Sequence, residues 1–208
     1  MRILVACEES QAVCIAFRNM GHEAYSCDIQ ECSGDHQEWH IIGDALKEAY
    51  SGKYDMMIAF PPCTYLSNAG ARHLYPKGKL NHDRYKKGLE GRAFFMSLYN
   101  APIKHICLEN PTPSKIYNLP ECNQIIQPYM FGHPYTKRTL LWLKNLPLLM
   151  PTKIISETKP YIVTKSVNTQ KEYNHTDAKQ RSKTFSGVAT AMAQQWSNPK
   201  YDIQLKLF

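Results

Sequence analysis

The sequence predicts an α/β fold with a mostly parallel sheet and helices on both faces. Short apolar runs rich in branched residues alternate with amphipathic segments, and acidic residues follow several of the runs. Buried parallel strands have this continuous apolar character, and their alternation with helices is typical of a doubly wound nucleotide-binding sheet. We therefore expect a ligand crevice at the carboxyl ends of the strands.

The expected elements follow one another along the chain. Ser10 can cap the first helix, whose apolar positions recur at helical spacing until Gly21 ends it. Residues 64–83 contain Asn, Gly and Pro and are expected to form a loop. The expected strands are residues 2–7, 23–27, 39–42, 55–60, 104–108, 124–129 and 139–143, and the expected helices are residues 10–21, 84–100 and 186–196.

The composition is that of an ordinary globular domain. The chain of 208 residues is 43% hydrophobic and 21% charged, which excludes disorder and collagen-like architectures. We expect one domain over residues 1–208, with residues 147–183 as a small irregular insert. No apolar run is long enough to span a bilayer and no signal peptide is recognised, so a cytoplasmic protein is expected, in the host cytoplasm if a phage encodes it.

Positive charge predominates. The chain has 25 Lys and Arg against 18 Asp and Glu, a net charge of +7, and a pI of about 9.0. Such a surplus suits a polyanionic partner, because each neutralised phosphate releases counterions. Basic residues are dense from Arg72 to Arg92, where phosphate contact and a merely solvated face both fit the pattern.

The seven cysteines do not predict a disulfide framework, because their number is odd and several lie in apolar runs. Cys27, Cys32, His36 and His40 have a spacing that could ligate zinc. Because Cys27 falls within an expected strand, a polar loop is the favoured interpretation and no metal site is predicted.

The sharpest chemical feature is Phe60-Pro61-Pro62-Cys63-Thr64, just after an expected strand. The two prolines restrict the backbone and remove two N–H donors, so the loop is rigid and aims Cys63. A thiolate presented in this way can act as a nucleophile. On spacing alone, a rigid strand exit with an idle cysteine is the commoner interpretation.

A carboxylic acid follows another expected strand, in Glu109-Asn110-Pro111. If both strands lie in one parallel sheet, Cys63 and Glu109 project into the same crevice. A thiol beside an acid suits addition to an electron-poor ring, since the acid can protonate a ring nitrogen as the sulfur attacks. Taken alone, Glu109 is more often a partner of a helix N-terminus.

Two further motifs complete a series. The four, in chain order, are Pro61-Pro62-Cys63, Glu109-Asn110-Pro111, Thr136-Lys137-Arg138 and Ser186-Gly187-Val188-Ala189. They resemble the nucleophile, Glu-Asn-Val, Gln-x-Arg-x-Arg and Gly-Asn-Ser-Val-Ala motifs of the DNA (cytosine-5) methyltransferase family. The resemblance covers most of residues 1–143 and 182–197, and the shorter phage-type members are most similar in length.

The resemblance implies a Rossmann-like, S-adenosylmethionine-dependent methyltransferase acting on cytosine in DNA. Cys63 would attack C6 of the ring and make C5 nucleophilic enough to take the methyl group. Glu109 would protonate N3, and Arg138 would hold the cytosine carbonyl. The target base must leave the duplex stack, or already be single-stranded, for this geometry to exist, and the segment from Arg72 to Arg92 would meet phosphates.

The resemblance also implies a cofactor site at the ends of the first strands. Asp28 would take the ribose hydroxyls, Asp44 the adenine amine, and Pro61 would flank the adenine. Ala6 and Glu8 belong to the stretch that matches the family's Gly-rich first motif. That stretch, residues 5–11, contains no glycine, although glycine is what lets a backbone approach a ligand closely.

Other departures keep alternatives open. Only 43 residues separate Arg138 from Ser182, too few for the family's target-recognition domain, and Leu140 replaces the second motif arginine. A specificity partner subunit, loose specificity, or an RNA or nucleotide substrate would account for this. The alternative function is a catalytically reduced relative that binds nucleic acid. Amino-group methylation is disfavoured, because such enzymes end a similar Pro-Pro loop in an aromatic residue where this chain has Cys63.

Overall fold

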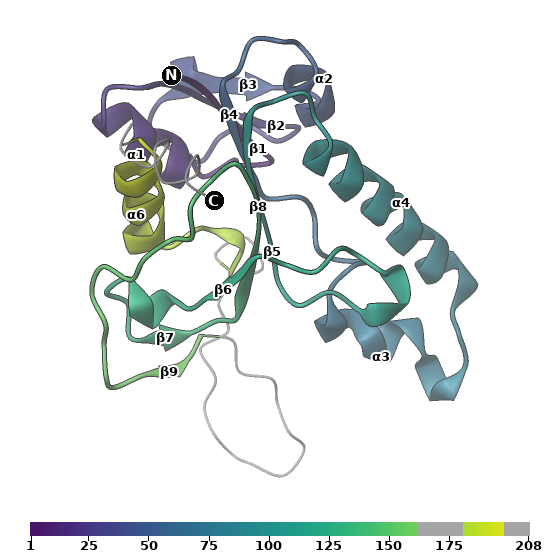
Figure 1. Ribbon diagram of the computed structural model, residues 1–208. Coiled ribbons are helices and arrows are strands. Elements are labelled where there is room, and N and C mark those ends of the chain that lie inside the picture. Colours follow the sequence, from purple (N-terminus) through teal and green to yellow (C-terminus); the bar gives the residue numbers. More distant parts are fainter. Residues whose placement is uncertain (162–180, 198–208) are drawn as a thin grey trace.

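The computed structural model describes residues 1–161 and 181–197 (Figure 1). Its main sheet has seven strands in the order β3-β2-β1-β4-β5-β8-β6. Neighbours from β3 to β5 are parallel, and β8 runs antiparallel between β5 and β6. The strands are β1 (Arg2–Ala6), β2 (Glu23–Asp28), β3 (His40–Ile42), β4 (Met56–Ala59), β5 (His105–Asn110), β6 (Gln124–Ile126) and β8 (Thr139–Lys144).

Helices cover both faces of this sheet. The principal ones are α1 (Ala12–Asn19), α2 (Ala45–Ala49), α4 (His82–Tyr99) and α6 (Ser186–Trp196). α1 and α6 pack together on one face, whereas α2 and α4 lie on the other (Figure 1). Each face has its own buried core, and on the α4 side the rings of Phe95 and Trp142 meet edge to face at 5.0 Å. The predicted α/β fold with helices on both faces of a mostly parallel sheet is confirmed.

Three local predictions differ from the structure. Residues 64–83 form short helices rather than a plain loop, and α4 begins at His82 because Asn81 Oδ1 accepts a hydrogen bond from the Arg84 amide. β6 ends at Ile126, since Pro128 opens a 3₁₀ helix. The short helices are α3 (Ala71–Leu74) and the 3₁₀ turns η1 (Gln37–Trp39), η2 (Asn68–Gly70), η3 (Pro76–Gly78), η4 (Lys115–Tyr117) and η5 (Pro128–Met130).

A second, two-stranded sheet was not predicted. β7 (Tyr135–Thr136) and β9 (Lys159–Pro160) pair in parallel, and β9 lies in the stretch expected to be irregular. Between β8 and β9, the chain passes along β6 and α6. There the side-chain amide of Gln124 exchanges two hydrogen bonds with the backbone of Leu149, and that of Gln195 exchanges two with the backbone of Met150. The rest of the expected insert, residues 162–180, lies outside the described residues.

The sheet order brings the predicted chemistry to one edge. β1 lies between β2 and β4, so the chain order reverses beside it, and a ligand crevice forms at such a reversal. The loops after β1 and β4 and the end of β5 all leave the sheet at this edge. None of the helices described in residues 1–161 and 181–197 is long and apolar enough to cross a membrane.

Candidate active site

Cys63 and Glu109 come from neighbouring parallel strands. Cys63 lies on the loop that follows β4, and Glu109 is the penultimate residue of β5, which pairs with β4. The two side chains are close enough that the negative charge of Glu109 raises the pKa of the Cys63 thiol. The structure therefore brings these two predicted residues together.

The loop that carries Cys63 is held by side chains from outside it. Asn110, which is buried, donates from Nδ2 to the carbonyl of Pro61 at 2.8 Å. Arg84 on α4 donates to the carbonyl of Thr64 at 2.8 Å, and its guanidinium lies 4.9 Å from the centre of the Tyr65 ring. The loop is thus tied to β5 on one side of Cys63 and to α4 on the other.

The Cys63 carbonyl also closes a tight turn. It accepts hydrogen bonds from the amides of Leu66, at 3.1 Å, and Ser67, at 2.8 Å. Because the prolines before Cys63 have restricted φ angles and the turn after it is hydrogen-bonded, its backbone has little freedom. The half-buried thiol is therefore presented in a defined direction.

Burial sets the protonation of both groups. Desolvation is the main cause that raises the pKa of Cys63, and the charge of Glu109 adds to it. Desolvation also raises the pKa of Glu109, which favours its neutral acid form, whereas the charge of Lys137 lowers both pKa values. A neutral carboxylic acid can donate a hydrogen bond or a proton, and Lys137 is the nearby cation that eases formation of a thiolate.

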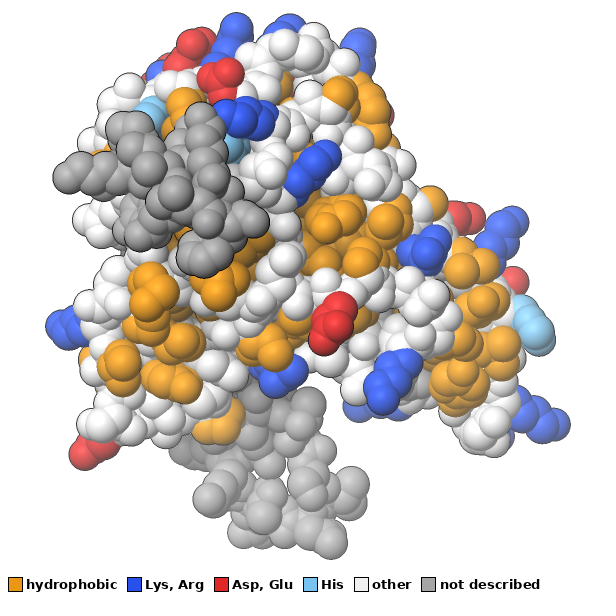
Figure 2. Space-filling view, viewed as in Figure 1, with side chains coloured by type: hydrophobic (Ala, Val, Ile, Leu, Met, Phe, Trp, Pro, Cys, Tyr) orange, Lys and Arg blue, Asp and Glu red, His pale blue; other side chains and the backbone are white. Residues whose placement is uncertain are grey.

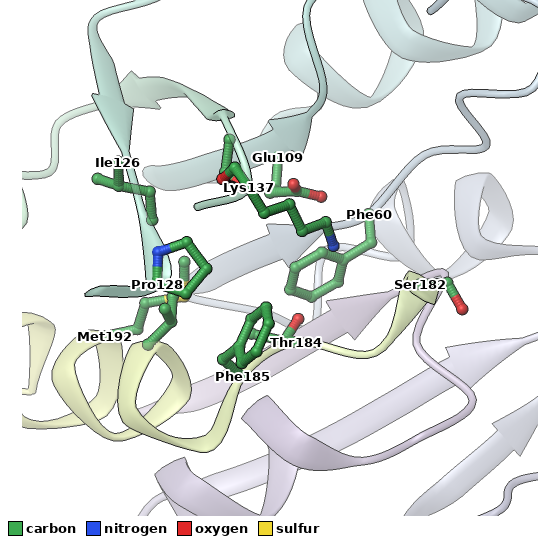
Figure 3. A pocket seen from close by; sticks show the side chains of 11 residues that line it. Phe60, Glu109, Ile126, Pro128, Lys137, Ser182, Thr184, Phe185 and Met192 are labelled. Atoms are coloured by element: carbon green, nitrogen blue, oxygen red, sulfur yellow. Dashed lines mark hydrogen bonds between the residues drawn. The ribbon is translucent and has the colours of Figure 1, made fainter. Parts of the chain in front are cut away.

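A pocket opens beside Glu109 (Figure 3). Its polar groups include the Glu109 carboxylate and the Lys137 ammonium, set among apolar side chains from β6, η5 and α6. The lining residues are Phe60, Glu109, Ile126, Pro128, Lys137, Thr139, Ser182, Thr184, Phe185, Val188 and Met192. The pocket thus places one acid and one amine among apolar side chains, a mixture typical of small-molecule sites.

The motif cation that reaches this pocket is Lys137, while Arg138 is exposed. Lys137 Nζ donates to the carbonyl of Arg181 at 2.8 Å and lies about 6 Å from the rings of Tyr161 and Phe185. Sequence reasoning favoured Arg138 because it matched a motif letter. The two residues lie between β7 and β8, where motif matching does not indicate which side chain turns inward.

The start of α6 forms one wall of the pocket. The amide of Gly187 donates to Nε2 of His133 at 3.0 Å, so an imidazole caps this helix. A side chain at Gly187 would overlap the carbonyl of Phe131, which explains the glycine. Burial lowers the pKa of His133, and the neutral ring is the form that can accept this hydrogen bond.

The loop after β1 contains no glycine, yet two of its residues have backbones that favour glycine. Cys7 and Gln11 both have left-handed backbones, with φ of 58° and 59°, a conformation that glycine adopts most readily. Glu8 is buried and accepts hydrogen bonds from the amides of Val13, at 2.7 Å, and Cys14, at 3.2 Å. Glu8 therefore caps α1, the role that the sequence suggested for Ser10.

Gln11 completes this loop by bridging two neighbouring segments. Its amide nitrogen donates to the carbonyl of His36 at 2.7 Å, and its amide oxygen accepts from the backbone of His36 at 3.2 Å. Gly34 packs so closely on Gln11 that a Cβ at Gly34 would overlap its side chain. The fully buried Gln11 thus links the ends of β1 and β2.

The remaining predicted cofactor residues border the same loop. Asp28 ends β2 and accepts from the amide of Gln30 at 2.9 Å, and Asp44 caps α2 through the amide of Leu46 at 2.8 Å. Both carboxylates contribute to raising the pKa of Cys7 to about 12, after the larger effect of burial, so they face the same region. Ala6 and Pro61 are buried beneath it.

The candidate zinc ligands have other partners. Cys27 Sγ faces the carbonyl of Gly43 and Cys32 Sγ that of Gly34, both at 3.7 Å. His40 bonds to Ser26 and Gln30, and His36 stacks on Trp39. No group of three or more His, Cys, Asp or Glu side chains within the described residues could hold a metal ion.

The basic segment lies on α3, η3 and α4, directly after the Cys63 loop. Arg72, Lys77, Lys79, Lys86 and Lys87 are exposed. Figure 2 shows Lys and Arg side chains on the visible face of this part of the molecule. Across residues 64–92, seven Lys and Arg stand against two acidic residues, so this stretch supplies most of the net positive charge.

Comparison with known proteins found similarity in folded structure only. No known protein family and no curated protein matches the sequence. One similar solved structure is a candidate DNA modification methyltransferase encoded within an E. coli prophage, with 13% identity and a TM-score of 0.46 over 78% of this chain. Another is the Entamoeba histolytica methyltransferase EhMeth, with 16% identity and a TM-score of 0.42 over 74% of this chain. The matches span 56% and 57% of those two chains.

Proposed function

We propose that the protein transfers a methyl group from S-adenosylmethionine to C5 of cytosine in DNA, through a covalent bond between Cys63 and C6. The observation that carries this proposal is the meeting of Cys63 and Glu109 at the ends of two adjacent parallel strands, beside a pocket that Glu109 lines. A nucleophile and an acid in this arrangement match the needs of addition across the C5–C6 bond of a pyrimidine.

The chemistry assigns one role to each group. The Cys63 sulfur bonds to C6 while Glu109 donates a proton to N3, which converts C5 into a nucleophilic carbon. Burial favours the acid form of Glu109 that this step requires. After C5 has accepted the methyl group, N3 returns its proton to Glu109, a water molecule takes the C5 proton, and the thiolate leaves C6, which restores the aromatic ring and frees Cys63.

Lys137 is the cation that we assign to the base, in place of Arg138. Its ammonium lines the pocket together with Glu109, and its charge lowers the pKa of Cys63. A cation there would hold the cytosine carbonyl and stabilise the attacking thiolate. The exposed Arg138 is then available to a phosphate or to a partner subunit.

The loop after β1 suits S-adenosylmethionine better than a dinucleotide. In nucleotide-binding folds the first helix N-terminus commonly binds phosphate, but here the Glu8 carboxylate occupies that position. The Glu8 carboxylate would repel a phosphate at this position, whereas a cationic nucleoside such as S-adenosylmethionine carries no phosphate. Asp28 and Asp44 would contact such a molecule, Ala6 and Pro61 would lie beneath it, and the buried Glu8 would hold the loop beside it through α1. When bound, it supplies an electrophilic methyl group.

The DNA partner would meet the basic segment from Arg72 to Arg92. The segment follows the Cys63 loop directly and is fixed to it by the hydrogen bond from Arg84 to Thr64. Phosphate contacts from these side chains would position the strand without reading its sequence. The alternative function, binding of nucleic acid by a relative that has lost cofactor binding, uses the same surface.

Intact-mass spectrometry after incubation with S-adenosylmethionine and an oligonucleotide containing 5-fluorocytosine tests the proposal. Fluorine at C5 cannot leave as a proton, so a working enzyme remains bonded to its substrate. We expect an added mass of the oligonucleotide plus one methyl group. The Cys63→Ala variant should form no adduct, and Glu109→Gln should form it about a hundredfold more slowly, because the acid is lost.

The Cys122→Ala variant is the matched control, because it also removes a half-buried free thiol but lies away from the β4 loop. It should form the adduct as the wild-type protein does. An adduct that persists in Cys63→Ala would contradict the assigned nucleophile. Absence of any adduct with single- or double-stranded DNA, in a protein that still binds DNA, would favour the alternative function.

A further inference from the structure

A second aromatic and basic surface adjoins the pocket. We name it the β7–β9 cluster; its rings are His133, Tyr135, Tyr161 and Phe185, and its cations are Lys137, Lys153, Lys159, Arg181 and Lys183. The rings touch one another, with centroids 4.8 to 5.9 Å apart. The cluster is therefore a packed platform rather than a set of loose side chains.

Cations border these rings. Lys159 Nζ lies 5.5 Å from the centre of the Tyr135 ring, and Lys137 Nζ lies 5.9 Å from that of Tyr161. Charge is strongly one-sided here: residues 132–161 and 181–197 contain seven Lys and Arg, five of them in the cluster, and one acidic residue, Glu157. An ordinary solvated surface carries mixed charges, so this composition points to an anionic ligand.

The cluster is continuous with the proposed active site. Phe185 and Lys137 belong to both, since they line the pocket (Figure 3). They also approach Tyr161: the ring centres of Phe185 and Tyr161 are 4.8 Å apart, and Lys137 Nζ lies 5.9 Å from the centre of the Tyr161 ring. A polymer whose reacting unit enters the pocket would pass over the neighbouring platform. The ligand of the cluster is then part of the same molecule as the substrate.

We propose that the β7–β9 cluster binds single-stranded DNA that flanks the target base. This inference rests on the proposed function, because it takes the pocket as the site of the reacting base. Rings that stack on bases, interleaved with cations that neutralise phosphates, are the means by which proteins hold single strands without reading sequence. Paired bases in a duplex do not offer their faces to such rings, so the cluster favours an unpaired substrate.

Fluorescence anisotropy with a labelled oligo(dT) of about 15 nucleotides tests this inference, because that length covers a typical single-strand site. Lys159→Glu and Lys183→Glu reverse exposed charges of the cluster. Each should weaken binding about fivefold and reduce its dependence on salt, since one fewer counterion is released. Tyr161→Leu should weaken binding about tenfold through loss of stacking, at a salt dependence like that of the wild type.

Lys144→Glu is the matched control. It makes the same charge change at the far end of β8, opposite Ile106 rather than near the pocket. We expect its affinity to stay within about twofold of the wild type, since a rim charge away from the ligand is screened within about 10 Å. Equal loss in Lys144→Glu and Lys159→Glu would overturn the inference, as would tighter binding of a duplex of the same length.

The probe separates this inference from the proposed function. Oligo(dT) contains no cytosine, so its binding needs no reaction at Cys63. If the charge variants lose oligo(dT) binding but no 5-fluorocytosine adduct forms, the β7–β9 cluster binds single-stranded DNA and the proposed chemistry is wrong. If the adduct forms but Lys159→Glu, Lys183→Glu and Tyr161→Leu bind oligo(dT) like the wild type, the proposed chemistry is supported and the inferred DNA binding by the cluster is wrong.

Discussion

The loop after β1 and the loop after β4 leave adjacent strands at the same edge of the sheet, yet they are held in different ways. The first is supported from within, by the left-handed Cys7 and Gln11 and by the Glu8 cap on α1. The second is supported from outside, by Asn110 on β5 and Arg84 on α4. The loop proposed to hold the cofactor and the loop proposed to carry the nucleophile thus reach similar order by different means.

The difference has a physical reason. A loop that must leave room for a ligand benefits from side chains that turn back into its own helix, as Glu8 does. A loop that must aim one side chain benefits from restraints on either side of it, as the two hydrogen bonds around Cys63 provide. Variants that remove a restraint should therefore affect ligand binding in the first loop and aim in the second.

Asn110→Ala should have the largest effect in this comparison. It removes the donor to the Pro61 carbonyl from a buried position, which we expect to lower the free energy of unfolding by about 1–3 kcal/mol. Formation of the 5-fluorocytosine adduct should slow about tenfold to a hundredfold, because Cys63 loses its alignment. Urea denaturation and timed intact-mass measurements check the two effects.

Asn100→Ala supplies the control for this variant, because Asn100 is exposed at the end of α4 and makes the same change of side chain. Its stability should stay within about 0.5 kcal/mol of the wild type. If Asn110→Ala were destabilised but formed the adduct at the wild-type rate, the hydrogen bond to Pro61 would have no part in aiming Cys63.

The pH dependence of the stability of Glu8→Gln tests how Glu8 supports the loop after β1. Burial raises the pKa of Glu8 to about 7, so the folded protein holds a proton that the unfolded chain releases near 4.5. The stability linked to this proton is fully present below pH 4.5 and is lost as the pH rises through 7. Glutamine does not titrate, so the free energy of unfolding of the variant, relative to the wild type, should rise between pH 5 and pH 8.

Urea denaturation at several pH values measures this difference. Glu31→Gln is the control, because Glu31 is exposed. The stability of that variant relative to the wild type should not rise with pH over this range. If the difference in free energy of unfolding between the wild type and Glu8→Gln were constant from pH 5 to pH 8, the Glu8 carboxyl would not titrate in this range.

These two loops also define what the sequence could predict. The strands that lead to them were located from apolar runs, and the pairing of Cys63 with Glu109 followed from two strand ends in one sheet. The direction in which a side chain points could not be predicted from the sequence in this way. Lys137 and Arg138 are adjacent letters with equal charge, and only the turn between β7 and β8 decides which one faces Glu109.

Contacts between distant segments were also missed. The β7–β9 pairing joins residues more than twenty positions apart, and neither strand is long enough to have a hydrophobic period. Glu8 was expected near a cofactor, but its role as a cap depends on a side chain that reaches five and six residues ahead. Local patterns predict elements, whereas these features depend on how the elements meet.

Cys7→Gly and Cys7→Val give the smallest effects and separate backbone strain from side-chain packing. A left-handed residue other than glycine costs roughly 1 kcal/mol, and glycine removes that cost but gives the unfolded chain about as much extra entropy. Glycine also removes a thiol that packs against the core on the α4 side, so we expect Cys7→Gly to be less stable than the wild type by at most about 1 kcal/mol. A β-branched valine tolerates this conformation poorly, so Cys7→Val should be less stable by about 1–2 kcal/mol. If urea denaturation found the two variants equally stable, the first loop would carry no strain at Cys7, and its support would come from Glu8 and Gln11 alone.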